Sequence, residues 1–196
     1  MPKLVDHDRR RRELAEVVWR VIATQGIEGV SIRDVAAEAG WSSGALRHYF
    51  TTKEELLGYA ADLVIERVTE RVTSASQAAS LRQAVRGNLV ELLPLDPDRL
   101  TEARIWHAFV TRSLVDPALA DRQGIVFDEF HDLCRGLVGE VERHGQLGEG
   151  LVPDLEVDHV HALVDGLALH LLLGRLDPAR AEAALDAYLA RLIVER

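Results

Sequence analysis

Cysteine and aromatic residues are scarce in this sequence of 196 residues. Cys134 is the one cysteine, which excludes an internal disulfide and a multi-cysteine metal site, so nothing requires an oxidising compartment. Aromatic residues make up 5% of the chain, whereas Ala, Leu, Val, Glu and Arg dominate, and the six prolines lie mostly between segments of helical periodicity. This composition predicts an all-α protein.

Long apolar runs are also missing. The most apolar run, residues 167–173, is too short to cross a bilayer and contains His170. The charged start, MPKLVDHDRRRRELAEV, lacks the apolar core of a signal peptide. We therefore expect a cytoplasmic protein without a membrane partner. With 47% hydrophobic residues, the chain can still bury a core of ordinary size.

The chain lacks net positive charge, since its formal net charge is -9. The charge is unevenly distributed. Residues 1–53 hold nine Lys/Arg and seven Asp/Glu, a net charge of +2, whereas residues 54–196 hold fourteen and twenty-five, a net charge of -11. Only the N-terminal quarter is electrostatically suited to nucleic acid. We expect a DNA-binding domain over residues 1–53 and a second helical domain over residues 54–196.

Apolar periodicity, caps and Pro or Gly boundaries predict about nine helices. The N-terminal part should contain a helix over about 8–25, two short helices between Ser31 and Phe50, and a long helix from Thr52 to about Thr73. The other helices are expected at about 81–93, 98–115, 117–145, 155–174 and 178–194.

The two short helices are separated by a turn that begins at Gly40, a pattern typical of a helix-turn-helix. In the second one, Leu46 and Phe50 lie four residues apart and share one face, while Arg47 points elsewhere. Small residues at its start, 42–45, allow the backbone to approach phosphates and base edges. We expect this helix to enter the DNA major groove. Short helices separated by Gly also occur in helical bundles that bind nothing.

The stretch GVSIRDVAAEAGWSSGALRHYFTTKEELL resembles the DNA-binding segment of the tetracycline-repressor (TetR) family. The family pattern is a small cap, an apolar-Ala-x-x-x-Gly turn, and an aromatic-rich end followed by x-x-Lys-x-x-Leu. The similarity covers residues 9–57 without a gap. It implies a DNA-binding transcriptional regulator with no enzymatic activity and no cofactor.

The resemblance assigns DNA contacts to ten positions of this sequence. They are Ser31, Arg33, Ser42, Ser43, Gly44, Ala45, Arg47, His48, Tyr49 and Lys53. Tyr49 and Lys53 match phosphate-binding positions of the family, although Tyr49 could instead belong to the core. Arg47 departs from the pattern, because many members carry an aromatic residue there. Whether Arg47 reads a base or holds a phosphate is therefore open.

Residues 54–196 resemble the C-terminal domain of the same family. The stretches LLPLDPDRLTEARIWHAFVTRSLVDPALA and LVDGLALHLLLG are similar to its choline-responsive BetI branch. This resemblance implies a pocket for a small-molecule effector, which the branch does not identify, and a homodimer formed by the last two helices of each subunit. The apolar stripes suited to this pairing contain Val160, Val164, Leu167, Leu171, Leu185, Tyr188, Leu189 and Leu192. The core of one subunit explains the inner half of each stripe equally well.

Aromatic, imidazole and thiol groups are concentrated on two neighbouring expected helices, a mixture suited to an organic ligand. The candidate pocket residues are Trp106, His107, Val110, Phe127, Phe130, His131 and Cys134. An ordinary core is the competing interpretation for the phenylalanines. For His107 and His131, the alternative is a hydrogen-bonded histidine of the core or surface.

Two Asp-x-x-His pairs leave an enzyme as an alternative. Asp128-x-x-His131 and Asp158-x-x-His161 each place a carboxylate and an imidazole on one helical face, as in half of a di-iron bundle site. The other half would require carboxylates from two further helices. Nominees for these are Glu91 and Glu102, which no motif identifies.

The leading hypothesis is a ligand-releasable repressor that binds a palindromic double-stranded DNA operator as a homodimer. A di-iron-like bundle enzyme and a non-DNA-binding helical interaction protein are the alternatives.

Overall fold

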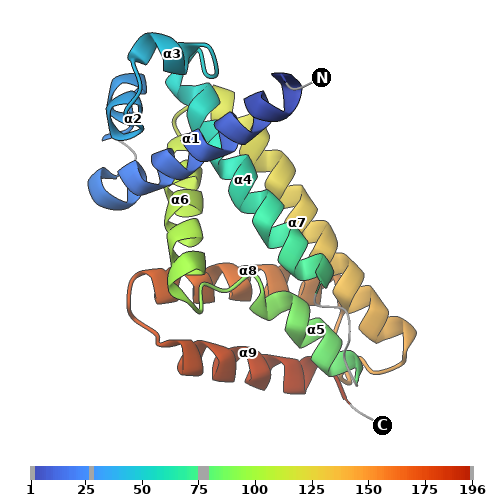
Figure 1. The fold of residues 1–196 in the computed structure, drawn as a ribbon. Coiled ribbons are helices and arrows are strands. Elements are labelled where there is room, and N and C mark those ends of the chain that lie inside the picture. The colour runs from blue at the N-terminus through green and yellow to red at the C-terminus, as the bar shows by residue number, and fades with distance from the viewer. Residues whose placement is uncertain (1–2, 27–28, 75–79, 195–196) are drawn as a thin grey trace. The chain divides into compact units, whose positions relative to one another are not determined.

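The computed structural model describes residues 3–26, 29–74 and 80–194, which form nine α-helices and no extended strand (Figure 1). The helices are α1 (Lys3–Gln25), α2 (Ile32–Glu38), α3 (Ser43–Arg47), α4 (Lys53–Ser74), α5 (Leu81–Val90), α6 (Pro97–Ser113), α7 (Pro117–Arg143), α8 (Pro153–Leu172) and α9 (Pro178–Leu192). The expected all-α class is confirmed. None of these helices is both long and apolar enough to cross a membrane.

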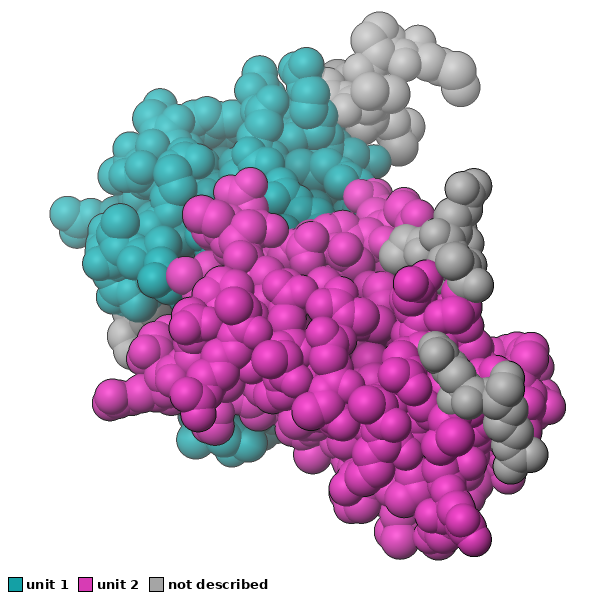
Figure 2. Space-filling model, turned by 90° about the horizontal axis from the view of Figure 1, so that it is seen from below, with its two compact units in different colours: residues 1–67, 101–124 teal, residues 68–100, 125–196 magenta. Residues whose placement is uncertain are grey.

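Two compact units make up the fold (Figure 2). Unit 1 comprises Met1–Arg67 and Thr101–Gly124, and unit 2 comprises Val68–Leu100 and Ile125–Arg196. Three helices, α4, α6 and α7, contribute residues to both units. The units therefore do not follow the domain boundary placed at residue 53, which stays a prediction.

Local sequence accounts for most helix boundaries. The side chains of Ser31, Ser42 and Thr52 each accept a hydrogen bond from the backbone N–H three residues on, at 3.1 Å. These caps begin α2, α3 and α4. Between α2 and α3 the chain turns at Gly40, whose φ of 70° is a conformation that favours glycine. The four later helices that begin with proline are α6, α7, α8 and α9.

Apolar burial holds the short helices of unit 1. Leu46 and Phe50 are both 0% exposed, as their four-residue spacing predicted. The Phe50 ring lies 5.4 Å from the Tyr59 ring of α4, and its other neighbour is the Arg11 guanidinium of α1, 4.8 Å from the ring centroid. One face of α3 is thus fixed, and α2 packs against both α1 and α3.

Arg67 of α4 connects three helices of unit 1. Its guanidinium lies 4.4 Å from the ring centroid of Trp19 on α1 and donates a hydrogen bond to Glu16 Oε1 at 2.9 Å. It also lies 3.8 Å from Glu102 Oε1 on α6. Because Glu102 is only 5% exposed, its carboxylate depends on such a cationic neighbour.

Unit 2 has its own core, in which α9 packs against both α5 and α8 (Figure 1). Val160, Leu185 and Leu189 are among the residues that fill it, each at most 1% exposed. At the surface, Arg86 of α5 donates hydrogen bonds to two carboxylates of α9. The acceptors are Glu182, at 2.7 Å, and Asp186, at 2.6 Å.

We expect Leu46→Ala to lower the free energy of unfolding by about 2–5 kcal/mol, because the substitution loses buried apolar contact and leaves a cavity. Leu114→Ala is the matched control, since Leu114 is 80% exposed in the turn after α6; its change should stay within about 0.5 kcal/mol. Urea unfolding at one protein concentration, followed by circular dichroism, measures both. Equal losses would contradict the role of Leu46 in the core.

Candidate functional site

The side of α3 opposite its buried face is open. Arg47 and His48 are exposed, and so is Gly44. A Cβ atom added at Gly44 would meet only Ser42 Oγ, at 3.9 Å, which is an ordinary contact. The packing of the chain itself therefore does not require glycine at this position. A low surface here suits the close approach of another molecule.

None of the ten positions assigned to DNA contact is buried. Five of them are exposed, namely Arg33, Ser42, Gly44, Arg47 and His48, and five are partly exposed, namely Ser31, Ser43, Ala45, Tyr49 and Lys53. They come from the adjoining helices α2 and α3 and from the start of α4. Side chains that contact DNA must be accessible in this way, but which of them do so stays a prediction.

Tyr49 contacts two other rings. It stacks on His7 of α1, with centroids 4.8 Å apart and an interplanar angle of 28°. The second neighbour is Trp41, at 5.5 Å and 59°. The sequence alone did not point to His7, because the contact joins residues that are far apart along the chain.

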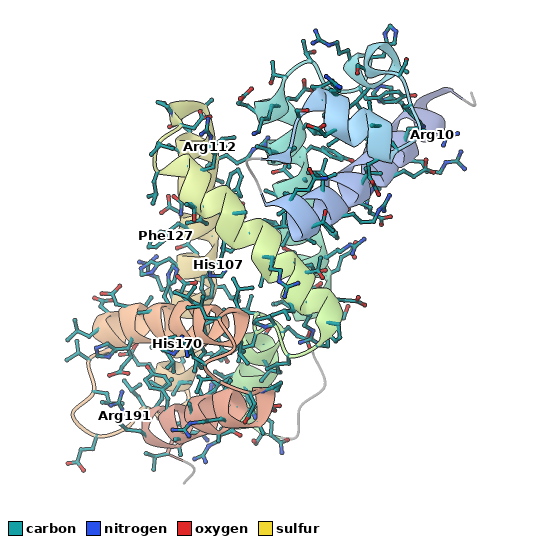
Figure 3. All side chains as sticks on the ribbon, turned by 90° about the vertical axis from the view of Figure 1, so that its left-hand side faces the viewer. Arg10, His107, Arg112, Phe127, His170 and Arg191 are labelled. Carbon is teal, nitrogen blue, oxygen red and sulfur yellow. The ribbon has the colours of Figure 1, made fainter. Side chains whose placement is uncertain are left out.

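The candidate pocket residues of unit 1 lie on α6. Trp106 stacks on Phe109, with ring centroids 5.6 Å apart. Phe109 is buried in the small apolar cluster of unit 1, and the partly exposed Trp106 packs against this cluster. His107 is partly exposed, and its Nδ1 lies 2.8 Å from the carbonyl oxygen of Ala103 (Figure 3). This contact assigns the proton to Nδ1, which leaves Nε2 as an acceptor in the neutral ring.

In unit 2, the candidate residues of α7 surround a histidine of α8. The ring of His161 lies 4.4 Å from Phe127 and 4.2 Å from Phe130, measured between centroids. His161 Nδ1 lies 3.4 Å from His131 Nδ1. His161 is 4% exposed, whereas Phe127 is 48% exposed. The sequence placed His161 only in the metal alternative, yet it shares the apolar face of α8.

Two carboxylates approach this histidine pair. Asp158 Oδ1 lies 3.9 Å from His131 Nε2, and Asp165 Oδ2 lies 3.6 Å from His161 Nε2. Burial lowers the pKa of His161, and Asp165 partly opposes this effect. Cys134 is 0% exposed, and burial raises the pKa of its thiol to about 12. Its place is therefore in the core of unit 2, with the thiol protonated at neutral pH.

The described residues contain no group of three or more His, Cys, Asp or Glu side chains placed to hold a metal ion. Glu91 instead pairs with Arg99 at 3.0 Å and Arg71 at 3.5 Å. Glu102 faces Arg67. The carboxylates nominated for a di-iron site are thus paired with arginines.

Most of the residues expected at a dimer interface are buried within the single chain. Val160, Val164, Leu167, Leu171, Leu185, Leu189 and Leu192 are at most 7% exposed, in the core of unit 2. Tyr188 is partly buried and donates a hydrogen bond to Glu156 Oε2 at 2.6 Å. Burial thus supports the alternative that these stripes serve the core of one subunit, because such side chains offer no surface to a second copy.

The opposite faces of α8 and α9 carry mainly apolar or small residues that are exposed or partly exposed. On α8 the outer stripe is Leu155, Ala162, Gly166 and Leu169, interrupted by the exposed His159 and followed by Leu173 just after the helix; the three leucines are 54%, 40% and 60% exposed. The outer stripe of α9 is Ala179, Ala183, Ala187 and Ala190, and the exposed Val194 follows the end of the helix. The sequence analysis missed both stripes, because alanine and glycine give little hydrophobic contrast.

Comparison with known proteins relates these features to regulators of transcription. Residues 16–60 match the family model of bacterial regulatory proteins, tetR family, and residues 79–194 match that of the BetI-type transcriptional repressor C-terminal domain. The HTH-type transcriptional regulator PksA of Bacillus subtilis (strain 168) is 40% identical over 185 residues, which cover 92% of this chain and 85% of PksA. HTH-type transcriptional regulator BetI of Burkholderia mallei (strain NCTC 10229) is 28% identical over 204 residues, covering 100% of each.

Solved structures show the same fold. A transcriptional regulator from Saccharomonospora viridis in complex with choline has a TM-score of 0.85 and 25% identity, over 96% of this chain and 100% of that chain. A transcriptional regulator from Rhodococcus sp. Rha1 has a TM-score of 0.81 and 28% identity, over 93% and 95%.

The lowered pKa of His161 predicts a dependence of stability on pH. The neutral imidazole contributes fully above the ordinary histidine pKa of about 6.5, and its contribution is lost as pH falls toward the lowered folded-state pKa. We therefore expect the free energy of unfolding to fall more between about pH 7.5 and about pH 5.5 in the wild type than in His161→Phe. Urea unfolding of both proteins at each pH measures this difference. The packing lost in the variant lowers its free energy of unfolding at both pH values alike, so it does not affect the comparison. Parallel profiles would contradict it.

Proposed function

This chain belongs to the tetR family of bacterial transcriptional regulators, and we propose that it is a repressor that binds a palindromic operator as a homodimer. A small molecule bound by the C-terminal part would release the operator. The observation that carries the DNA-binding proposal is the accessible polar side of α3 on a support that is fully buried at Leu46 and Phe50.

In the proposed complex, α3 lies in the major groove. The start of α3, where Gly44 leaves the surface low, approaches the DNA most closely. Arg47 carries a rigid set of donors that suits either guanine or phosphate. Tyr49 and Lys53 would bind phosphates, which fix the register but read no sequence.

A dimer is required on physical grounds, because one recognition helix reads few base pairs. Two copies about 34–36 Å apart can read a palindrome in successive major grooves. We place the subunit contact on the outer stripes of α8 and α9. A partner subunit would bury the exposed leucines of α8, and the small residues would let helices approach closely. Such a contact is isologous, so each stripe meets the same surface of the partner.

We assign effector contacts to two groups of residues. One is the α6 group with Trp106, His107 and Val110; the other is Phe127, Phe130 and His131 together with His161. The choline in the Saccharomonospora viridis regulator supports a small-molecule ligand, and choline is the first compound to test for release of the operator.

The effect of the ligand would be a population shift, limited by its differential affinity for the DNA-binding and released conformations. Arg67 offers a route within unit 1. Since it contacts α1 through Glu16 and α6 through Glu102, a displacement of α6 changes the support of α1 and hence of α3.

Selection from a random pool of duplexes by the wild-type protein tests DNA binding and supplies the operator. We expect Arg47→Ala to weaken binding to the selected duplex by about 1–3 kcal/mol, and Tyr49→Phe by about 1 kcal/mol through loss of a phosphate hydrogen bond. Fluorescence anisotropy at fixed physiological salt measures both. The matched control is Arg175→Ala, since Arg175 is exposed in the turn after α8.

Unchanged affinity in both variants would refute the assignment of α3 to the major groove. Repeating the selection with Arg47→Ala separates the two roles of Arg47. A relaxed preference at one base pair indicates base reading, whereas a uniform loss with a smaller salt slope indicates a phosphate contact.

For the dimer, we expect Ala187→Glu on α9 and Leu169→Glu on α8 to shift the protein toward monomer. Each would bury a carboxylate in an apolar contact without a partner. Ala120→Glu, at an exposed position of α7, is the control and should leave the dimer intact. Sedimentation velocity at micromolar concentration gives the answer. A wild-type protein that sediments only as a monomer would contradict the proposed dimer. Variants that stay dimeric would contradict the assignment of the subunit contact to the outer stripes.

A further inference from the structure

We propose that His7 of α1 is an additional DNA-contacting residue, which holds the Tyr49 ring and, when protonated, binds the operator phosphate next to Tyr49. The inference rests on the proposed function, in which Tyr49 itself lies at a phosphate. It assigns part of the operator surface to the N-terminal end of α1, outside α2 and α3.

The geometry of Tyr49 is the first support. Trp41 covers one part of its ring at 5.5 Å and 59°, and His7 stacks on it at 4.8 Å and 28°. The tyrosine is partly buried, whereas His7 is exposed. An aromatic side chain in contact with two other rings has less rotational freedom before DNA binds, so less entropy is lost on binding.

The position of the imidazole is the second support. The His7 ring, stacked on Tyr49 with centroids 4.8 Å apart, lies within reach of the phosphate group that the Tyr49 phenol would bind. The imidazole is also exposed to solvent. Phenylalanine would stack equally well, but only histidine adds an N–H donor and a charge that changes near neutral pH.

The charged groups near His7 are of both signs, because the exposed Asp8 directly follows it on α1. Tyr49 faces it from the turn after α3, and Arg10 and Arg11 follow it at i+3 and i+4 on α1. The guanidinium of Arg10 lies 5.8 Å from the Trp41 ring centroid, so it belongs to the same surface. Glu13 pairs with Arg10, at 2.7 Å.

This arrangement predicts proton uptake on operator binding. A DNA phosphate beside the His7 ring favours the imidazolium over the neutral imidazole. Affinity for the operator therefore increases as pH falls through the range where histidine titrates.

The test compares the wild type with His7→Phe and His7→Ala on the duplex that the wild type selects. His7→Phe keeps a stacked ring without the charge, and His7→Ala removes both. Anisotropy titrations at about pH 6, 7 and 8 and at several salt concentrations give the pH profile and the salt slope. His144→Phe, at an exposed end of α7, is the matched control.

We expect His7→Phe to bind as the wild type does at about pH 8 and about two- to fivefold more weakly at about pH 6, with a salt slope smaller by about one phosphate contact. His7→Ala should be weaker at every pH. His48 is a second exposed histidine near α3, so the pH dependence that remains in His7→Phe is compared with that of His48→Gln. If circular dichroism shows His7→Phe to be unfolded, His7→Tyr replaces it, because tyrosine also keeps an aromatic ring without a positive charge.

A pH profile and salt slope of His7→Phe identical to those of the wild type would overturn the phosphate contact. Unchanged affinity of His7→Ala would overturn the support of Tyr49 as well. Failure of the wild type to select any duplex is a different result, because it would refute the proposed function rather than the role of His7.

Discussion

The burial of Leu46 and Phe50 is the interaction on which the DNA-binding part depends. Helix α3 spans only Ser43–Arg47, and a helix of one turn is not stable in water by itself. Its conformation must come from the two fully buried side chains and from the cap at Ser42. Because these contacts lie on one face, the other face carries polar side chains without cost to the core.

The same burial involves α1 and α4 through Arg11. Its guanidinium lies 4.8 Å from the Phe50 ring and 4.5 Å from the Tyr59 ring, and it pairs with Glu55 at 3.6 Å. Burial also raises the pKa of Tyr59, so the phenol stays neutral beside this cation. A small rotation of α4 thus changes the support of Phe50 directly. Arg11 thus connects the support of α3 to both α1 and α4.

Local features of the fold could be predicted from the sequence, and contacts between distant residues could not. The four-residue spacing of Leu46 and Phe50 predicted their shared buried face, and prolines predicted the starts of four helices. Both features depend only on residues that are close together in the sequence. His7 and His161 gave no such signal. Their neighbours, Tyr49 and Phe130, come from other helices, and only the tertiary fold brings them together.

Helix α8 shows why the sequence pattern points to its inner face. Its inner face carries Val160 and Val164, whose hydrophobicity dominates the periodic signal, yet its outer face carries Leu155, Leu169 and Leu173. A helix that is apolar on both sides is stable only when both are covered. The single chain covers one side. In the proposed dimer a second copy of the chain covers the other side, where the small residues would let helices approach closely.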